Sequence, residues 1–442
     1  MARRQRRQAL PEPFEVTIEG LSHEGRGIAH HNGKIVFVFA ALPGERVLIR
    51  IDKATRKYSE ASVVDVIEPS PDRIEPGCPH FGLCGGCSMQ HVASDTQLRL
   101  KQQAVLEMLQ HAGIDGATIM PPLLSPAWGY RRKARLGVKY VLKKQRLLIG
   151  FRERNKPYLA DMQACRVLVE QVGLQLPKLM ELVDGMQARQ SIAQIEVAAD
   201  DEHTMLVFRH LEPLSGHDIE RLQAFARDSG MWVQLQPGGP DSMTALYPQQ
   251  QTLYFRPLAD GDIRIAFGAA DFTQVNNAIN QQMVRRVLEL LDLQPRDRVL
   301  DLFCGLGNFT LPMAQQALTV TGVEGDEGMV ARAQQAARDN GIHNTEYFCA
   351  DLSNVEARAS WLHQGYDKVL LDPPRSGAYE IIEQVAALGA STMVYVSCQP
   401  SSLVRDARRL VDAGYELTEF GIMDMFPQTA HVESMAVFRS RR

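Results

Sequence analysis

The chain has 442 residues, with 48 Lys and Arg against 52 Asp and Glu, so its formal net charge is −4. At about 100–200 residues per domain, this length predicts two to four domains. The hydrophobic fraction of 45% and the charged fraction of 23% are those of a folded protein, which excludes disordered and fibrous classes. The mild acidity argues against a nucleic-acid partner for the chain taken as a whole, because phosphate binders usually carry a basic footprint.

The N-terminal sequence is basic, but Pro11 and Glu12 follow where a secretory signal would have its apolar stretch. The longest apolar run, Ile35 to Leu42, has eight residues, against the roughly 20 that a membrane-spanning helix needs. We therefore expect residues 1–11 to form a flexible basic arm, the cytoplasm to be the compartment, and no membrane to be a partner.

Short β-strands are predicted between residues 12 and 70, at Phe14–Ile18, Ile35–Phe39, Arg46–Ile51 and Ala61–Ile67. Glycines between them mark the turns. This pattern fits a small Greek-key β-barrel, an architecture that often binds RNA. A β-meander that only supports its neighbour fits the same spacing.

Seven cysteines, an odd number in a long chain without a signal, favour metal ligation or catalysis over a disulfide framework. Cys78, Cys84, Cys87 and the distant Cys165 supply four thiolates, which suit zinc or an iron–sulfur cluster. Structural zinc usually uses two close pairs of ligands. The spacing therefore favours a cluster, with zinc as the alternative, and a structural role for either.

A polar helix is predicted at Ser94–Ala112, and residues 128 to about 265 mix strands and helices, as in an α+β domain. Within that domain, residues 131–156 contain eleven Lys or Arg and a single acid, Glu153, so this window carries +10 and the rest of the chain −14. Aromatic residues are interleaved with the basic ones. Basic groups bind phosphates and aromatic rings stack on unpaired bases, so the window predicts contact with RNA. A solvated hairpin face is the alternative.

From Asp271 onward, predicted strands alternate with helices, which indicates a doubly wound, mostly parallel sheet. The predicted strands are Arg298–Phe303, Val320–Glu324, Thr345–Cys349, Lys368–Asp372 and Met393–Cys398. The predicted helices are Ala278–Leu291, one from Phe309, Met329–Asn340 and one around residues 380–388.

The first strand of this sheet leads into its helix through Gly305 and Gly307, where the backbone can approach a ligand closely. Thr310 stands where a dinucleotide fingerprint has its third glycine, which argues against a pyrophosphate cofactor. Glu324 ends the next strand about 20 residues on, where a carboxylate can accept both ribose hydroxyls. A nucleoside without pyrophosphate fits S-adenosylmethionine.

Two further acids follow strands of the same sheet. Asp351, after the third strand, could meet the adenine amino group, and Asp372, in an Asp-Pro-Pro-Arg sequence, could orient a substrate. Asp351 could instead only cap its strand, and the Asp-Pro-Pro-Arg sequence could instead only form a rigid turn.

Cys398 ends the last strand of the alternating region, at the same predicted sheet edge as Gly305 and Asp372. An inert core cysteine is the commoner outcome, but this position favours a nucleophile. Addition of a thiolate to C6 of uracil makes C5 nucleophilic enough to accept a methyl group, and a base must then remove the C5 proton. His431 and Glu433 are both candidates for that base.

Together these residues resemble the RNA uracil-5-methyltransferases, specifically the 23S rRNA branch with a TRAM domain and a [4Fe–4S] cluster. The resemblance covers the chain after the arm and implies three domains. These are an OB-like TRAM barrel at 12–70, a central α+β domain with the cluster at 73–93 and 126–265, and a Rossmann-like catalytic domain at 94–125 and 266–442.

The resemblance also implies roles for single residues. Cys398 would be the nucleophile and Glu433 the base. Four cysteines would hold the [4Fe–4S] cluster: Cys78, Cys84, Cys87 and Cys165. The residues that would bind S-adenosylmethionine are Gln274, within Phe272–Asn276, together with Phe303, Asn308, Glu324, Asp351 and Asp372.

The implied reaction is C5 methylation of a uridine in 23S rRNA by a monomer without an obligate protein partner. The nearest alternative is a tRNA uracil-5-methyltransferase, which resembles this chain without the four cysteines and the barrel. A cytosine-5-methyltransferase would have Cys beside Pro where this chain has Asp372. A radical S-adenosylmethionine enzyme would space its cysteines differently, and a non-catalytic RNA-binding protein with a cluster is the remaining hypothesis.

Overall fold

The computed structural model describes residues 12–22, 24–354 and 359–441. The predicted basic arm, residues 1–11, lies outside the described residues. The chain divides into two compact units: one runs to Val105 and includes Gln428–His431, and the other comprises Leu106–Pro427 and Val432–Arg442. The division into three domains expected above stays a prediction.

The first unit contains a six-stranded sheet in the order β1-β5-β6-β4-β3-β2. Buried and exposed residues alternate along β5, and Val47, Ile49 and Ile51 enter a core that the other strands share. The four predicted strands are confirmed, with two short additions. The strands are β1 (Phe14–Thr17), β2 (Gly20–Leu21), β3 (Gly27–His31), β4 (Lys34–Phe39), β5 (Arg46–Ala54) and β6 (Tyr58–Glu68).

Helix α1 (Ser94–His111) follows, and then a second six-stranded sheet in the order β13-β12-β11-β10-β8-β9. Its strands are β8 (Lys133–Val141), β9 (Arg146–Gly150), β10 (Ile192–Ala199), β11 (Thr204–His210), β12 (Trp232–Gln236) and β13 (Thr244–Tyr247). Its helices are α2 (Glu170–Gly173), α3 (Leu176–Asp184) and α4 (Gly216–Ser229). The paired strands β14 (Leu253–Phe255) and β15 (Ile265–Phe267) follow.

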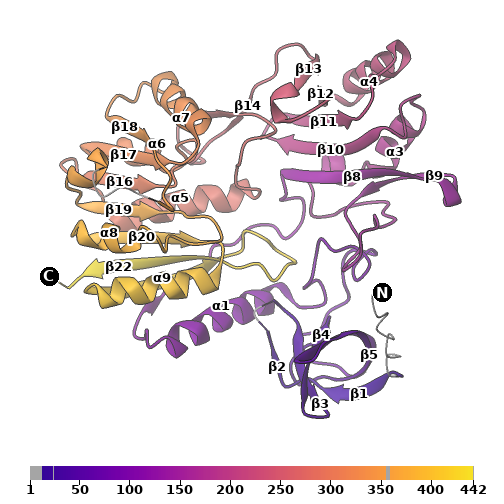
Figure 1. Cartoon of the computed structure of the whole chain (residues 1–442), viewed down its shortest axis with the longest axis horizontal. Helices are drawn as coiled ribbons and strands as arrows, with labels where there is room; N and C mark the ends of the chain where they lie inside the picture. The colour runs from indigo at the N-terminus through magenta and orange to yellow at the C-terminus, as the bar shows by residue number, and fades with distance from the viewer. Residues whose placement is uncertain (1–11, 23, 355–358, 442) are drawn as a thin grey trace, which may run out of the picture. The chain divides into compact units, whose positions relative to one another are not determined.

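An eight-stranded sheet forms the C-terminal part of the second unit, in the order β18-β17-β16-β19-β20-β22-β21-β7. The first five of these strands pair in parallel, which confirms the predicted doubly wound sheet. Figure 1 shows these strands side by side. The eight strands of the whole sheet are β16 (Arg298–Leu302), β17 (Thr319–Glu324), β18 (Thr345–Cys349), β19 (Lys368–Leu371), β20 (Thr392–Ser397), β21 (Tyr415–Met423), β22 (Glu433–Ser440) and β7 (Thr118–Ile119).

Helices alternate with the strands of this sheet, as the sequence pattern predicts. Helix α5 (Asn277–Leu291) precedes β16, and α6 (Thr310–Ala314), α7 (Glu327–Asp339) and α8 (Ile382–Ala387) lie between parallel strands. Helix α9 (Pro400–Asp412) leads from β20 to β21. Buried residues of α5 and β16 share one apolar core with residues of β20 and β22.

No strand was predicted beyond Cys398. The structure instead has an antiparallel hairpin, β21–β22, whose second strand pairs directly with β20. Six consecutive residues from Glu433 are buried. A strand covered on both faces shows no alternation of polar and apolar residues, so it lacks the pattern of a surface strand.

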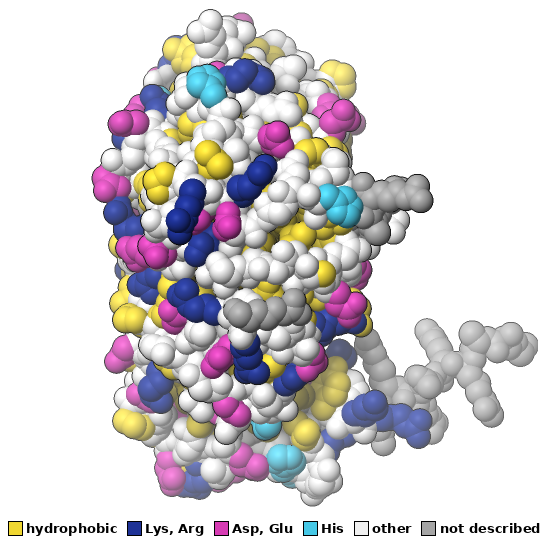
Figure 2. Space-filling view, turned by 90° about the vertical axis from the view of Figure 1, so that its left-hand side faces the viewer, with side chains coloured by type: hydrophobic (Ala, Val, Ile, Leu, Met, Phe, Trp, Pro, Cys, Tyr) yellow, Lys and Arg dark blue, Asp and Glu magenta, His cyan; other side chains and the backbone are white. Residues whose placement is uncertain are grey.

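Among the described residues, no helix has an apolar stretch long enough to cross a bilayer. On the face shown in Figure 2, Lys and Arg side chains are intermingled with Asp and Glu side chains.

Candidate active site

The strand register brings the predicted site residues to one edge of the eight-stranded sheet. Leu302 pairs with both Val323 and Leu371, so the residues that follow these three strand positions, Phe303, Glu324 and Asp372, are neighbours. Leu371 pairs in turn with Tyr395 on β20, three residues before Cys398. Ligands of open α/β sheets bind at this carboxyl edge, beside the strand where the order reverses, here β16.

The turn between β16 and α6 has the geometry of a ligand-binding loop. Phe303 has a φ of +64°, a conformation that costs energy in a non-glycine residue and occurs often at functional sites. Gly305 follows with a φ of +54°, and a Cβ there would face open space. The Gly305 N–H donates to Oε2 of Glu324 at 3.1 Å. The loop and the predicted ribose-binding carboxylate are thus connected directly.

Asn308, on the same loop, is held by α5. Its amide exchanges two hydrogen bonds with the amide of Asn280, at 2.9 and 3.0 Å. The segment with Gln274 enters α5, where Asn276 caps the helix by accepting from the Ile279 N–H. The buried Asn276 amide also donates to Ser125 Oγ at 2.8 Å. Gln274 is half-buried in this anchored segment.

Replacing Glu324 by Gln is expected to raise the Kd for S-adenosylmethionine about 10- to 100-fold, because a hydrogen bond to a charged group contributes about 1.5–3 kcal/mol. Titration calorimetry measures this Kd. Glu327→Gln is the matched control, since Glu327 is an exposed acid in the first turn of α7. Equal Kd values for the two variants would contradict the assignment.

Asp301 is a candidate site residue that was not predicted from the sequence. It is fully buried on β16, and its Oδ2 accepts from Thr310 Oγ1 at 2.5 Å, across the loop that contains both glycines. Burial raises its pKa to about 7, and the charges of Asp372 and Glu324 act in the same direction. A single Asp inside an otherwise apolar strand was the signal that could have found it.

Asp351 is placed differently from the other predicted donor-binding residues. It lies two residues after β18 and is exposed, and its Oδ1 accepts from the N–H and the hydroxyl of Ser353 at 2.9 and 2.6 Å. These hydrogen bonds lower its pKa. Its contact with adenine stays a prediction.

Cys398 and Glu433 lie opposite each other on neighbouring strand ends. Ser397 of β20 pairs antiparallel with Ser434 of β22, so the residue after Ser397 faces the residue before Ser434. Glu433 is buried, and Cys398 is half-buried. His431, the other candidate base, belongs to the first unit.

Burial and neighbouring charges shift the pKa values of Cys398, Glu433 and Asp372. Burial raises the pKa of the Cys398 thiol to about 11, and the charges of Glu433 and Asp372 add to the effect, whereas Arg375 opposes it. Burial and Asp372 raise the pKa of Glu433 to about 8, and Arg375 again opposes the shift. Burial raises the pKa of Asp372 to about 7. Perturbed groups gathered at one strand edge indicate a catalytic site.

Three of the four predicted cluster ligands, Cys78, Cys84 and Cys87, lie in the first unit, and Cys165 lies in the second. The Gly86 N–H points at Sγ of Cys84, 3.4 Å away. Burial raises the pKa of Cys84, and the neighbouring Cys78 contributes to the shift. In the part of the chain that the structure describes, no group of three or more His, Cys, Asp or Glu side chains has the arrangement of a metal site.

The basic window forms the β8–β9 hairpin and the segment after it. Lys139 and Lys143 are exposed, as is Tyr158 beyond the hairpin. Other basic residues of the window pair with acids: Arg132 with Asp201, Arg135 with Glu196, Arg146 and Lys144 with Asp161, and Lys156 with Glu153. The positive surface is therefore smaller than the count of basic residues suggests.

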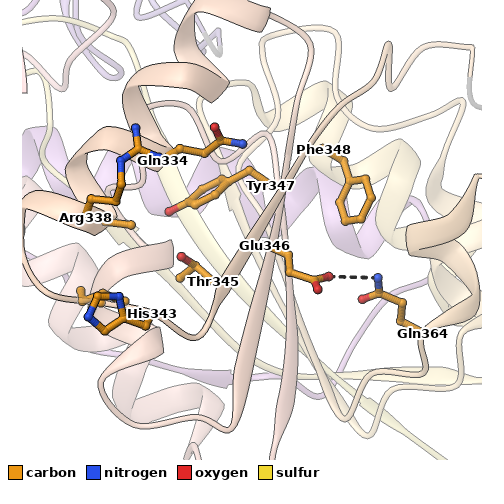
Figure 3. Close-up of a pocket in the computed structure, with 10 residues that line it drawn as sticks. Gln334, Arg338, His343, Thr345, Glu346, Tyr347, Phe348 and Gln364 are labelled. Atoms are coloured by element: carbon orange, nitrogen blue, oxygen red, sulfur yellow. Dashed lines mark hydrogen bonds between the residues drawn. The ribbon is translucent and has the colours of Figure 1, made fainter.

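A cavity of about 560 Å³ lies beside β18, the edge strand of the large sheet, and is lined also by residues of α7 (Figure 3). Glu346 accepts a hydrogen bond from Gln364 at its wall, at 3.2 Å. None of the predicted site residues lines this cavity. We therefore do not assign the methyl donor to this cavity.

The chain is similar to known proteins along nearly its whole length. Residues 95–442 match the family described as tRNA (Uracil-5-)-methyltransferase, and residues 12–64 match the TRAM domain. The 23S rRNA (uracil(1939)-C(5))-methyltransferase of Alkalilimnicola ehrlichii is 51% identical over 99% of both chains. The protein of the same name from Methylococcus capsulatus is 48% identical and covers 99% of this chain and 100% of its own length.

A solved structure has a similar fold. The tRNA (uracil-54, C5)-methyltransferase of Pyrococcus abyssi, in complex with S-adenosyl-L-homocysteine, aligns with a TM-score of 0.74. The alignment covers 96% of this chain and 100% of that one, at 21% identity. At this identity the likeness concerns the fold alone.

Proposed function

Because the chain belongs to the RNA uracil-C5-methyltransferase family, we propose that it transfers a methyl group from S-adenosylmethionine to carbon 5 of a uridine in 23S rRNA. The observation that carries the proposal is the β20–β22 register, which puts Cys398 opposite a buried carboxyl, Glu433. Both lie at the strand edge that also contains Glu324 and the glycine loop. The relatives that cover the whole chain are named for 23S rRNA.

In the proposed reaction, the Cys398 thiol first releases its proton to water. The thiolate then adds to C6 of the uracil, and the electron pair of the C5–C6 double bond moves onto the C4 oxygen as an enolate. Carbon 5 then forms a bond to the donor's methyl group, whose bond to sulfur breaks to leave S-adenosylhomocysteine. Glu433 takes the proton from C5. The electron pair of the broken C5–H bond restores the C5–C6 double bond, and the C6–S bond breaks to expel the Cys398 thiolate.

The pKa of Glu433 suits its proposed role. A carboxyl with a pKa of about 8 is near the operating pH, where a general base is most effective. The thiol, with its pKa of about 11, stays protonated until the substrate arrives, which protects it from other electrophiles. Arg375 lowers both pKa values and so favours the thiolate and the carboxylate that the reaction needs.

The exposed basic side chains of the β8–β9 hairpin would bind the RNA backbone, and the TRAM domain would add a second RNA surface.

The RNA substrate is tested by incubating the protein with a 23S rRNA transcript and, under the same conditions, with a tRNA transcript. We expect the protein to methylate the 23S rRNA transcript and to leave the tRNA transcript unmodified. Mass spectrometry of nuclease digests measures 5-methyluridine in each. Methylation of the tRNA alone would favour the tRNA function instead.

We further propose that Cys78, Cys84, Cys87 and Cys165 hold a [4Fe–4S] cluster. The N–H of Gly86 donates a hydrogen bond to the Cys84 sulfur, an arrangement that stabilises a metal-bound thiolate. When bound, the cluster would supply a cross-link among these cysteines through Fe–S bonds. No catalytic step uses it.

Anaerobic purification is expected to yield about four iron atoms per chain, and Cys84→Ser to lose most of the iron and lower the melting temperature. Cys349→Ser is the control, because Cys349 is exposed and outside the set. Metal analysis and calorimetry measure both effects. One zinc atom per chain in place of iron would establish the zinc alternative.

A further inference from the structure

We propose that Ser402, Arg405 and Asp406 of α9 are positioning residues, which hold the loop with Asp372 and Arg375 in place beside Cys398. This inference rests on the proposed function, since it concerns the same strand edge. Helix α9 begins two residues after Cys398, and the loop follows the neighbouring strand β19.

Three hydrogen bonds join the helix to consecutive parts of the loop. The Ser402 hydroxyl donates to the Arg375 carbonyl at 2.5 Å, and the Arg405 guanidinium donates to the Ser376 carbonyl at 2.7 Å. The Ala378 N–H donates to Oδ2 of Asp406 at 2.7 Å. Residues 402, 405 and 406 share one helix face because they are three and four positions apart.

Asp406 is the centre of this network. It is fully buried, and besides the Ala378 N–H it accepts from the Tyr395 hydroxyl of β20 at 2.7 Å and from the Arg405 guanidinium at 2.8 Å. A buried carboxylate is costly unless it is paired and hydrogen-bonded, and this one has three donors. The network therefore fixes one arrangement of β20, the loop and α9.

Gly377 lets the loop lie directly on this network. Its φ is +80°, and a Cβ there would lie 2.5 Å from Oδ2 of Asp406 and 2.6 Å from the Arg405 guanidinium. The loop backbone and the α9 side chains are therefore in direct contact. A small displacement of α9 would move the loop with it.

The loop matters for catalysis because of its charges. Cys398 faces Glu433 from β22 and Asp372 and Arg375 from the loop, and Arg375 is the group that lowers the pKa of both the thiol and the Glu433 carboxyl. When the loop is loosened, Arg375 acts less strongly on both groups. The pH–rate profile then shifts to higher pH, which a loss of general stability would not cause.

Arg405→Gln is the main test, and Arg408→Gln is its matched control. Both arginine side chains lie on α9 with 41% of their surface exposed, but Arg408 pairs with Asp412 instead of the loop. Arg405→Gln is expected to lower kcat about tenfold and to shift the pH profile upward. The KM for S-adenosylmethionine is expected to stay within about twofold of the wild-type value. Arg408→Gln is expected to change none of these.

A second variant and amide exchange test the proposal independently if Arg405→Gln folds poorly. Ser402→Ala removes one hydrogen bond to the loop and is expected to lower kcat in the same direction, with faster amide exchange across residues 375–378. Wild-type kcat and pH profiles in both Arg405→Gln and Ser402→Ala would overturn the proposal. Cys398→Ala is assayed in parallel: activity in that variant would instead overturn the proposed reaction itself.

Discussion

Replacing Cys398 by Ala is expected to lower kcat for uridine methylation by at least about 10⁴-fold, because the enzyme then has no nucleophile to activate C5 of the uracil. Transfer of tritium from labelled S-adenosylmethionine to a 23S rRNA fragment measures the loss. Binding of S-adenosylmethionine should be retained, since the glycine loop and Glu324 lie on other strands.

Cys349→Ala is the matched control for this experiment. Cys349 also ends a strand of the large sheet, but it lies on β18, at the far edge from β20. Methylation by the Cys349 variant at the wild-type rate, together with its loss in the Cys398 variant, is the expected pattern. Methylation by Cys398→Ala at the wild-type rate would show that the proposed reaction is wrong.

Glu433→Gln is expected to slow turnover about 10²- to 10⁴-fold, the range of a general base. The addition and methyl-transfer steps do not need the carboxylate, whereas removal of the C5 proton does. A covalent complex between protein and methylated RNA should therefore accumulate and survive denaturation. Electrophoresis in denaturant detects it, and the Cys398→Ala, Glu433→Gln double variant should not form it.

The same substitution has an expected effect on stability. Burial raises the pKa of Glu433 from 4.5 to about 8, so between these pH values the folded protein binds a proton that the unfolded chain has released. Stability falls as pH rises through this window, and neutral Gln removes that loss. Glu433→Gln should raise the melting temperature more at pH 8 than at pH 5. A lower melting temperature at pH 8 would indicate that the carboxylate has a structural role.

The C-terminal sheet could be predicted from the sequence, and so could the position of three candidate site residues at its edge. Glu324, Asp372 and Cys398 each end an apolar strand or directly follow one, and parallel strands gather their carboxyl ends at one edge. The resemblance to the family, including its TRAM domain, is confirmed by the relatives and the family matches.

Glu433 could not be chosen over His431 from the residues alone. The distinction depends on the register of an antiparallel strand that pairs with β20 across more than 30 residues of intervening chain. Periodicity predicts a strand but not its partner or its register. Asn280 and Asp301 were not predicted for a similar reason, because each contacts the glycine loop or its helix only through a side-chain hydrogen bond.

The charge of residues 131–156 shows another limit of prediction from the sequence. The window of residues 131–156 carries +10 by sequence, but Asp201 and Glu196 neutralise Arg132 and Arg135 from elsewhere in the chain. A local count does not include acids that the fold brings to neighbouring strands. The net charge of −4 and the basic window are compatible, because only the exposed residues of the hairpin need to face RNA.

The proposed reaction is tested most directly with a 23S rRNA fragment that contains 5-fluorouridine. Fluorine at C5 cannot be removed as a proton, so Glu433 cannot complete the reaction and the covalent intermediate is trapped. Mass spectrometry of the digested complex should find the peptide of Cys398 joined to methylated 5-fluorouridine, and only when S-adenosylmethionine is present. A complex joined through another cysteine, or none from an enzyme that methylates ordinary rRNA, would contradict the proposed reaction.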